Sequence, residues 1–356
     1  MSDDQAFPPP GAQPAPPPPP PGHGAHNPLP GWAPAPGMLG AAHKPGAMPL
    51  RPLALGDMYN AAFRIIRFNP KATVGSAVLV ASVAMLIPVV ISAVATFTLG
   101  AALDQTGEID SNASQAEVIG ATVSMGSIFG GSILVQIGLI FVTGMVAHVT
   151  YAAAIGKRLT LGEAWAATRG KRWKLLGLMC VINLAAALAV GIYAGMWALV
   201  VMMSSSTGPM VIWGVVTVPA FIAGMIWFWV RFYYLPAPVL MLEPVGVFDA
   251  IRRGYGLTRN QFWRIFGISL LTGIVTGIAG GMLGGPISLL GQLASLAVPE
   301  YALLGLALTQ ALSSVVSTAF VAPFASAVTS LQYIDQRMRK EAFDIELMSR
   351  AGITAS

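Results

Sequence analysis

Residues 72–99 read ATVGSAVLVASVAMLIPVVISAVATFTL, an apolar run without one charged side chain. An α-helix crosses the hydrocarbon core of a bilayer with about 20 apolar residues, so this run is long enough to span it. Further apolar runs follow along the chain. The pattern predicts an all-α, polytopic membrane protein with six transmembrane helices, at Ala72–Leu99, Ile119–Ile155, Leu175–Met203, Pro209–Val230, Ile265–Leu283 and Tyr301–Val328.

The composition of the whole chain favours the same class. Of its 356 residues, 55% are hydrophobic and 10% are charged, whereas soluble globular domains carry about 25% charged residues. Lipid tails accept apolar side chains, and helices satisfy their own backbone groups there. The single cysteine, Cys180, excludes an intrachain disulfide, and no cluster of Cys and His has metal-ligand spacing.

Two of the apolar runs do not fit a single straight crossing. The second run is too long, so we expect it to tilt, protrude or break at Gly130–Gly131. After the fifth run, the apolar segment Pro286–Pro299 is too short to span, and we expect it to be interfacial or re-entrant on the outer side.

The positions of the basic residues predict the orientation. All twenty Lys and Arg residues fall on one side of a six-span topology, whereas the loop Gly100–Val118 on the other side is acidic. Basic loops stay in the cytoplasm, so we expect a plasma-membrane protein with both termini cytoplasmic. The net charge of +5 therefore reflects topology, and we expect no nucleic-acid partner.

Composition divides the chain into three parts. Residues 1–50 are rich in proline, including Pro16–Pro21, and predict a disordered tail of polyproline II character. Such a tail is either a spacer or a docking segment for a protein partner. Residues 51–334 form the six-span domain. Residues 335–356 predict a cytoplasmic helix and tail with i,i+4 pairs, at Asp335–Arg339, Arg337–Glu341 and Lys340–Asp344.

A similar pattern precedes three of the spans, in units that start near residues 53, 160 and 246. Each has an acid (Asp57, Glu163 or Asp249), then a basic amphipathic stretch, then an aromatic beside a basic residue. We expect three interfacial elbow helices on the cytoplasmic side that contact anionic lipid headgroups. The predicted headgroup residues are Arg64, Arg67, Lys71, Arg172, Trp173, Lys174, Arg252, Arg253, Trp263 and Arg264.

Polar and small residues within the spans suggest packing and pairing. Gly273, Gly277, Gly281 and Gly285 are spaced four apart and predict a smooth helix-packing stripe, either within the chain or in a homo-oligomer. Glu243 is the one acid of a proline-rich cytoplasmic stretch, and we expect a structural ion pair with an arginine. The candidate partners are Arg231, Arg252 and Arg253.

Several stretches resemble the family of membrane domains named after glycerophosphoryl diester phosphodiesterases, and especially its actinobacterial members. They are Arg51–Asp57, Leu235–Pro244 (which contains Glu243), Ala250–Arg253, Asn260–Arg264, Tyr333–Arg339 and Asp344–Glu346. The resemblance covers most of residues 50–350 and implies a fold more than an activity. The phosphodiesterase activity of that family's name belongs to members fused to a soluble catalytic domain, so we do not carry it over.

Three functions remain open at the level of sequence. We favour a non-enzymatic membrane protein that organises lipids or partner proteins, with no catalytic residue, metal or cofactor. The alternative is an exporter or permease-like subunit for a lipid or amphipathic molecule, which a neutral cavity lined by Gln136, Asn183 and Gln310 would support. The third, a membrane-embedded hydrolase, rests on the family name alone.

Overall fold

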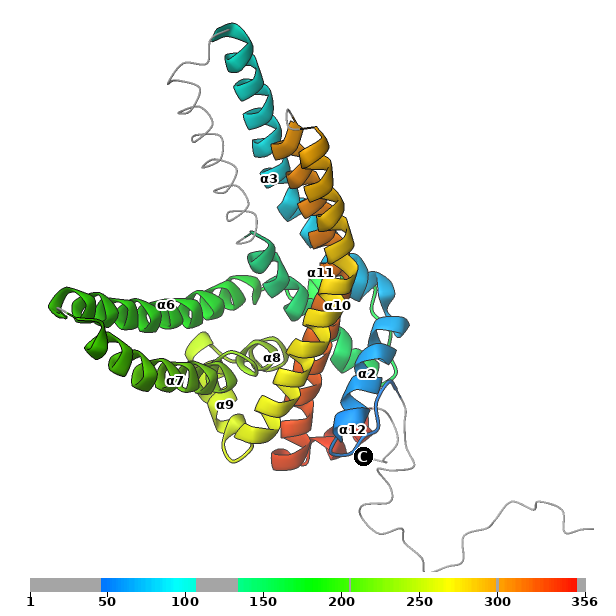
Figure 1. Cartoon of the computed structure of the whole chain (residues 1–356). Coiled ribbons are helices and arrows are strands. Elements are labelled where there is room, and N and C mark those ends of the chain that lie inside the picture. The colour runs from blue at the N-terminus through cyan, green and yellow to red at the C-terminus, as the bar shows by residue number, and fades with distance from the viewer. Residues whose placement is uncertain (1–45, 107–133, 205, 299–300, 351–356) are drawn as a thin grey trace, which may run out of the picture. The chain divides into compact units, whose positions relative to one another are not determined.

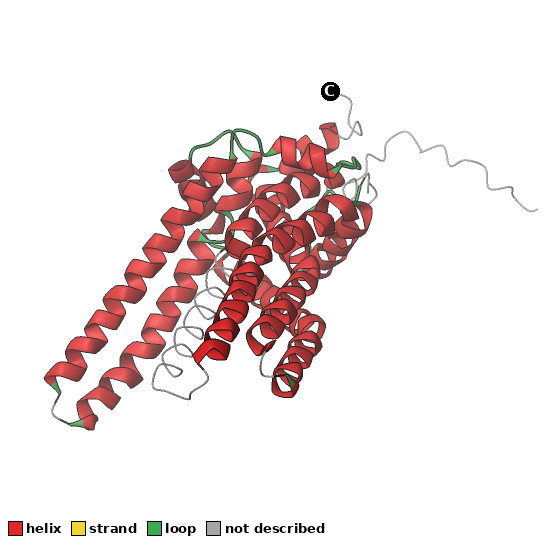
Figure 2. Ribbon diagram, turned by 90° about the horizontal axis from the view of Figure 1, so that it is seen from above, coloured by secondary structure: helices red, strands yellow, loops and turns green. Residues whose placement is uncertain are grey.

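A computed structural model of the chain describes residues 46–106, 134–204, 206–298 and 301–350. Its described part is helical and contains no strand (Figures 1 and 2). Ten helices have both ends described, and residues 134–154 form a further helical segment. The ten are α2 (Leu55–Phe68), α3 (Pro70–Thr106), α5 (Leu161–Ala167), α6 (Arg172–Met203), α7 (Thr207–Phe232), α8 (Pro236–Leu242), α9 (Val247–Thr258), α10 (Phe262–Ala297), α11 (Ala302–Glu341) and α12 (Phe343–Arg350).

Six helical stretches are long and apolar enough to cross a membrane, which confirms the predicted fold class and the multi-pass architecture. They are Pro70–Val94, Leu134–Ala154, Arg172–Met203, Thr207–Leu242, Phe262–Ala297 and Leu304–Glu341. Their apolar side chains are largely exposed, and in Thr207–Leu242 the most apolar window has 0% of its residues buried. Such surfaces need lipid or partner helices around them. The predicted break at Gly130–Gly131 lies outside the described residues.

The prediction for Pro286–Pro299 is wrong, because α10 continues through Pro286 to Ala297 as one helix. Proline removes one backbone donor, but neighbouring hydroxyl groups can support a helix around it in a membrane. Here Ser313 Oγ donates to the carbonyl of Gly284 at 2.9 Å, and Ser317 Oγ donates to that of Gly280 at 3.0 Å. Side chains of α11 therefore hold the turns of α10 that precede the proline.

The glycines that pack α10 against α11 differ from the predicted stripe. A Cβ at Gly280, Gly284 or Gly291 would lie within 3.2 Å of an α11 side chain. At each of the predicted positions Gly273, Gly277, Gly281 and Gly285, a Cβ would meet nothing within 4 Å. Within the described residues the predicted stripe therefore does not pack internally, because successive residues point about 100° apart around a helix and a shift of one position selects another face. The alternative, a contact between copies of the chain, stays a prediction.

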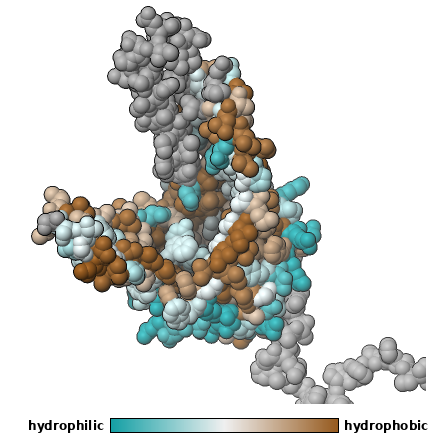
Figure 3. Space-filling model, in the orientation of Figure 1, coloured by the Kyte–Doolittle hydropathy of each residue, from teal (hydrophilic) through white to brown (hydrophobic). Residues whose placement is uncertain are grey.

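The main buried cluster lies where the short helices meet the ends of the long ones. It joins Met58 and Ile65 of α2 to Leu240 of α8, Leu257 of α9 and Leu347 of α12, among others. In Figure 3, hydrophilic residues gather around the end of the molecule at which α2, α9 and α12 lie, while hydrophobic residues follow the long helices. The short helices thus form a compact polar end, from which the long apolar helices extend.

The last residues of the predicted tail belong to this cluster rather than to a disordered segment. Met48 and Leu50 are both 0% exposed, and the backbone N–H of Ala47 donates to the carbonyl of Ala153 at 2.9 Å. At Gly46 a Cβ would collide with the carbonyl oxygens of the same helical segment. The predicted boundary at residue 50 is therefore too late by at least five residues, which hydropathy could not reveal within a proline-rich stretch.

A short helix occupies each of the three predicted repeat positions, as α2, α5 and α9, with its acid in the first turn. In α5, Glu163 accepts from the backbone N–H and the hydroxyl of Thr160 at 2.7 and 2.9 Å, which forms a capping box. These two bonds hold the pKa of the Glu163 carboxyl below its usual value. Their position at a lipid interface stays a prediction.

The last helix continues beyond residue 334, as the i,i+4 pairs predict, because α11 runs on to Glu341. Two of the three predicted pairs form there, Arg339–Asp335 at 3.0 Å and Arg337–Glu341 at 2.9 Å. The third, Lys340–Asp344, is wrong because the helix stops at Ala342, whose φ of 51° turns the chain into α12. Lys340 Nζ instead donates to the carbonyl oxygens of Gly256 and Arg259.

Candidate functional site

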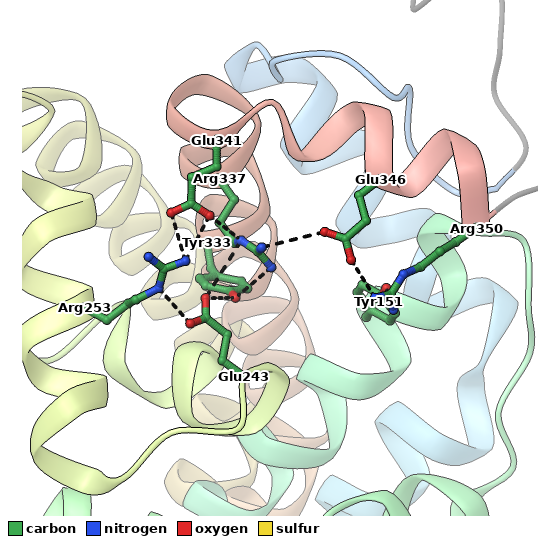
Figure 4. A network of polar contacts seen from close by, with 8 residues as sticks. All are labelled: Tyr151, Glu243, Arg253, Tyr333, Arg337, Glu341, Glu346 and Arg350. Carbon is green, nitrogen blue, oxygen red and sulfur yellow. Dashed lines mark hydrogen bonds and ion pairs between the residues drawn. The ribbon is translucent and has the colours of Figure 1, made fainter. Parts of the chain in front are cut away.

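Glu243 lies at the centre of a charge network at the polar end of the molecule (Figure 4). One carboxylate oxygen accepts from Arg253 Nε at 2.7 Å, and the other accepts from the hydroxyl of Tyr333 at 2.8 Å. Arg253 also contacts Glu341 at 2.9 Å. Of the three candidate partners, Arg253 is therefore the one that Glu243 binds. The pair joins the end of α8 to the middle of α9, and Tyr333 and Glu341 connect it to α11.

Arg337 extends this network to α12. Its guanidinium contacts Glu341 at 2.9 Å and Glu346 at 3.9 Å, and lies 3.8 Å from the centroid of the Phe343 ring. In turn, Arg350 donates to the hydroxyl of Tyr151 at 2.6 Å. These contacts fasten α12 to α11 and to the helical segment 134–154.

A second cluster surrounds Asp335, whose carboxylate is 0% exposed. It accepts from the backbone N–H of Leu53 at 2.8 Å and from Arg339 Nε at 3.0 Å, and pairs with Arg264 Nη2 at 3.2 Å. Both arginines also donate to the carbonyl of Leu53. A buried carboxylate is stable only with such partners, so Asp335 in α11 ties the segment before α2 to the first turn of α10.

A lysine at the start of α6 contacts the end of α8. Lys171 Nζ donates to the carbonyl oxygens of Met241 and Glu243, at 2.9 and 2.7 Å. Burial, with the positive charge of Lys174 nearby, lowers the pKa of the Lys171 ammonium from its usual value. In the sequence, Lys171 is one of the basic residues on the predicted cytoplasmic side. Nothing near it predicts that its ammonium group donates hydrogen bonds to two backbone carbonyl oxygens.

The predicted headgroup residues separate into two groups. Three arginines have partners within the protein: Arg253 and Arg264 form the ion pairs above, and Arg172 donates to the carbonyl of Trp165 at 2.6 Å and lies 3.6 Å from its ring centroid. Their main contacts are therefore internal rather than with lipid. The others are exposed, namely Arg64, Arg67, Lys71, Trp173, Lys174, Arg252 and Trp263.

Among the exposed residues, the two tryptophans are unusual for their size. Trp173 is 85% exposed and Trp263 is 77% exposed, each at the second residue of a long helix. Lys174 follows Trp173 directly and is exposed as well. An aromatic with a neighbouring cation at the end of a span is typical of a membrane–water interface. The exposed residues Arg67, Lys71, Trp173, Lys174 and Trp263, which lie at or next to the first residues of long helices, are named the interfacial set below.

Three hollows lie near residues singled out by the sequence. A groove of about 360 Å³ between α9 and the end of α11 is lined by Arg252, Arg253 and Lys340 with Asp249 and Glu341. An apolar groove of about 380 Å³ between α6 and α7 contains Asn183, whose amide donates to the carbonyl of Met179 at 2.8 Å.

The third hollow is a cavity of about 180 Å³ within the spans, lined by both Gln136 and Gln310. Gln136 and Gln310 therefore line the same hollow, whereas Asn183 lies in the groove between α6 and α7. No group of three or more His, Cys, Asp or Glu side chains within residues 46–106, 134–204, 206–298 and 301–350 could hold a metal ion.

Sequence reasoning missed the central role of Asp335 and Tyr333. Asp335 was expected only as the partner of Arg339 within one helix, but its contact with Leu53 spans 282 residues of sequence. One signal was present, since an acid directly after an apolar span is costly unless it finds a cation. The pair with Arg339 in the same helix would already have supplied that cation.

Comparison with known families gives one match, over residues 114–333, to the domain of unknown function DUF7847. The chain belongs to this family. The matched region covers more than half of the chain and contains Glu243, Arg253, Arg264 and Tyr333, while Asp335 lies two residues beyond it. No curated protein matches the chain, and no solved structure matches it. Nothing links the chain to the phosphodiesterase membrane-domain family, so that resemblance stays a prediction.

Proposed function

We propose that this DUF7847 protein is a non-enzymatic multi-pass protein of the plasma membrane that gathers anionic lipids at its cytoplasmic face. The observation that carries the proposal is the interfacial set, in which large aromatics and cations without an ion pair among the described residues are exposed where long apolar helices begin. A cation near an anionic leaflet contributes about 1 kcal/mol. Both termini would lie in the cytoplasm, as the distribution of basic residues predicts.

The internal ion pairs support a static role for the polar end. Glu243, Asp335 and their arginines join α8, α9, α10 and α11 through short contacts, and in the described residues these acids already have cationic partners. The network would therefore hold the elbow helices in place while the exposed cations contact lipid. The proline-rich tail would add a docking segment for a protein partner.

The test measures lipid selectivity of the full chain reconstituted in mixed bilayers. Electron paramagnetic resonance with spin-labelled phosphatidylglycerol and phosphatidylcholine gives the relative association constant of the two lipids at the protein surface. We expect a several-fold preference for the anionic lipid, which falls towards one in the triple variant Arg67→Gln/Lys71→Gln/Lys174→Gln.

The matched control removes the same charge from exposed basic residues of the same predicted side that lie outside the interfacial set. It is the triple variant Lys157→Gln/Arg169→Gln/Arg259→Gln. This control should keep most of the preference. An equal fall in both triple variants, or no preference in the unmodified protein, would reject the interfacial set as the lipid site.

A permease-like subunit for a lipid or amphipathic molecule is the second candidate. The observation that favours it is the cavity within the spans, where Gln136 and Gln310 line one hollow. A flux assay in liposomes that contain the full chain tests it, because a permease must raise the transfer rate of the molecule and a scaffold must not.

A further inference from the structure

The cavity within the spans is formed by three helices that are far apart in sequence. Met85 and Pro88 come from α3, Gln136 from the helical segment 134–154, and Gln310 and Ser314 from α11. α3 and α11 pack along one another. The cavity lies far from the polar end, since Pro88 is about 27 Å along α3 from Pro70 at 1.5 Å per residue.

The polar groups that line the cavity have no partner in the part of the chain that the structure describes. Several other hydroxyl side chains of the spans donate to the carbonyl four residues earlier, as Ser330 does at 2.8 Å. Ser314 makes no such bond, and neither amide has a hydrogen bond, although Gln136 and Gln310 together offer donors and acceptors to the hollow.

Pro88 leaves one further hydrogen-bond acceptor without its usual helical donor. Because proline has no backbone N–H, the carbonyl of Ala84, four residues earlier, lacks its usual helical donor. Ala84 is buried beside Met85 and Val135, and both of these neighbours line the cavity. Both glutamines are exposed to this hollow, and with Ser314 they give it three polar side chains that have no hydrogen-bond partner within the described residues. The hollow is therefore suited to a guest that forms hydrogen bonds.

The lining also defines the chemistry of that guest. The lining residues carry no charge, so an ionic group would find no counter-charge. Amides and a hydroxyl donate and accept, so they match hydroxyl and carbonyl oxygens. The volume of about 180 Å³ corresponds to roughly six water molecules at about 30 Å³ each. It is too small for a whole lipid and suits its glycerol-ester region or a small free polyol.

We propose that the cavity lined by Gln136, Gln310 and Ser314 is a binding site for an uncharged group that carries several hydroxyl or ester oxygens. Two sources have this chemistry, namely the backbone of an uncharged lipid such as diacylglycerol and a free polyol such as glycerol. The site is separate from the interfacial set, and it requires neither anionic lipid nor the elbow helices.

The experiment uses the full chain in lipid nanodiscs and two probes. Native mass spectrometry measures retention of added diacylglycerol, and saturation-transfer NMR measures contact with free glycerol. The test variant is Gln136→Met/Gln310→Met, because methionine keeps the length of glutamine and removes its hydrogen bonds. The control is Gln292→Met, which changes an exposed glutamine of α10 outside the cavity.

We expect one of the two probes to bind the unmodified protein and the control, with a loss of about tenfold or more in the double variant. Diacylglycerol binding assigns the site to lipid, and glycerol binding assigns it to a free solute. Binding of neither probe, with water as the only occupant, would overturn the proposal, and so would equal binding to the double variant. A thermal melt of each variant in the same nanodiscs shows that the loss is not due to unfolding.

Discussion

The substitution Asp335→Asn should destabilise the protein more than any other change of a single charge at the polar end. The carboxylate is 0% exposed and pairs with Arg264 and Arg339, whose side chains are 28% and 30% exposed. Asparagine keeps the shape and one acceptor for the N–H of Leu53, but it leaves both guanidiniums without their counter-charge. Removing one partner of a buried ion pair costs about 3–5 kcal/mol. Because the arginines retain some water, we expect a loss of about 3 kcal/mol.

The assay is unfolding of the purified full chain in mixed micelles with increasing sodium dodecyl sulfate, followed by tryptophan fluorescence. Glu346→Gln provides the matched control, because its carboxylate is 43% exposed and pairs with Arg350 at the surface of α12. Exposed pairs contribute about 0–1 kcal/mol. If Asp335→Asn lost no more stability than Glu346→Gln, the role given to Asp335 as the joint between Leu53, Arg264 and α11 would be refuted.

Three further predictions concern packing, the chain start and pH. Gly284→Ala should cost about 1–3 kcal/mol, because its Cβ would collide with serine side chains of α11, whereas Gly281→Ala should be neutral or slightly stabilising; the same unfolding assay compares them. A chain that begins at Gly46 should fold like the full chain, while one that begins at Arg51 loses the buried Met48 and Leu50 and should aggregate, as size-exclusion chromatography would show. Because the folded state holds the pKa of Glu163 below its usual value, its capping contribution should be present above the unfolded carboxyl pKa and be lost as the pH falls through the folded pKa; a melt series at decreasing pH should therefore show a smaller acid-induced loss for Glu163→Gln than for the unmodified chain.

Hydropathy and charge were sufficient to predict the architecture. Long uncharged runs such as Ala72–Leu99 have no stable place in water, so their number and positions follow from composition. The short helices at Asp57, Glu163 and Asp249 were also predictable, because an acid in a first turn is a local signal. These features depend on residues that are neighbours in the chain.

What could not be predicted depends on contacts between distant segments. A shift of one residue decides which face of α10 meets α11. The regular spacing of Gly273–Gly285 was therefore misleading, because Gly280 and Gly284 are the glycines that pack against α11. In the sequence, Pro286 predicts the end of a helix. In the structure, Ser313 of α11 donates to the carbonyl of Gly284, and α10 continues through the proline. The bond between Asp335 and Leu53 likewise has no local sign.

The central claim is a six-span protein with both termini in the cytoplasm, and single-cysteine labelling tests it most directly. In a Cys180→Ala background, one cysteine is introduced at a time as Ser2→Cys, Ser111→Cys or Ser356→Cys, and intact cells are treated with a membrane-impermeant maleimide. We expect labelling of Ser111→Cys in intact cells, and labelling of the two terminal variants only after permeabilisation. Labelling of either terminal variant in intact cells, or protection of Ser111→Cys, would contradict the topology.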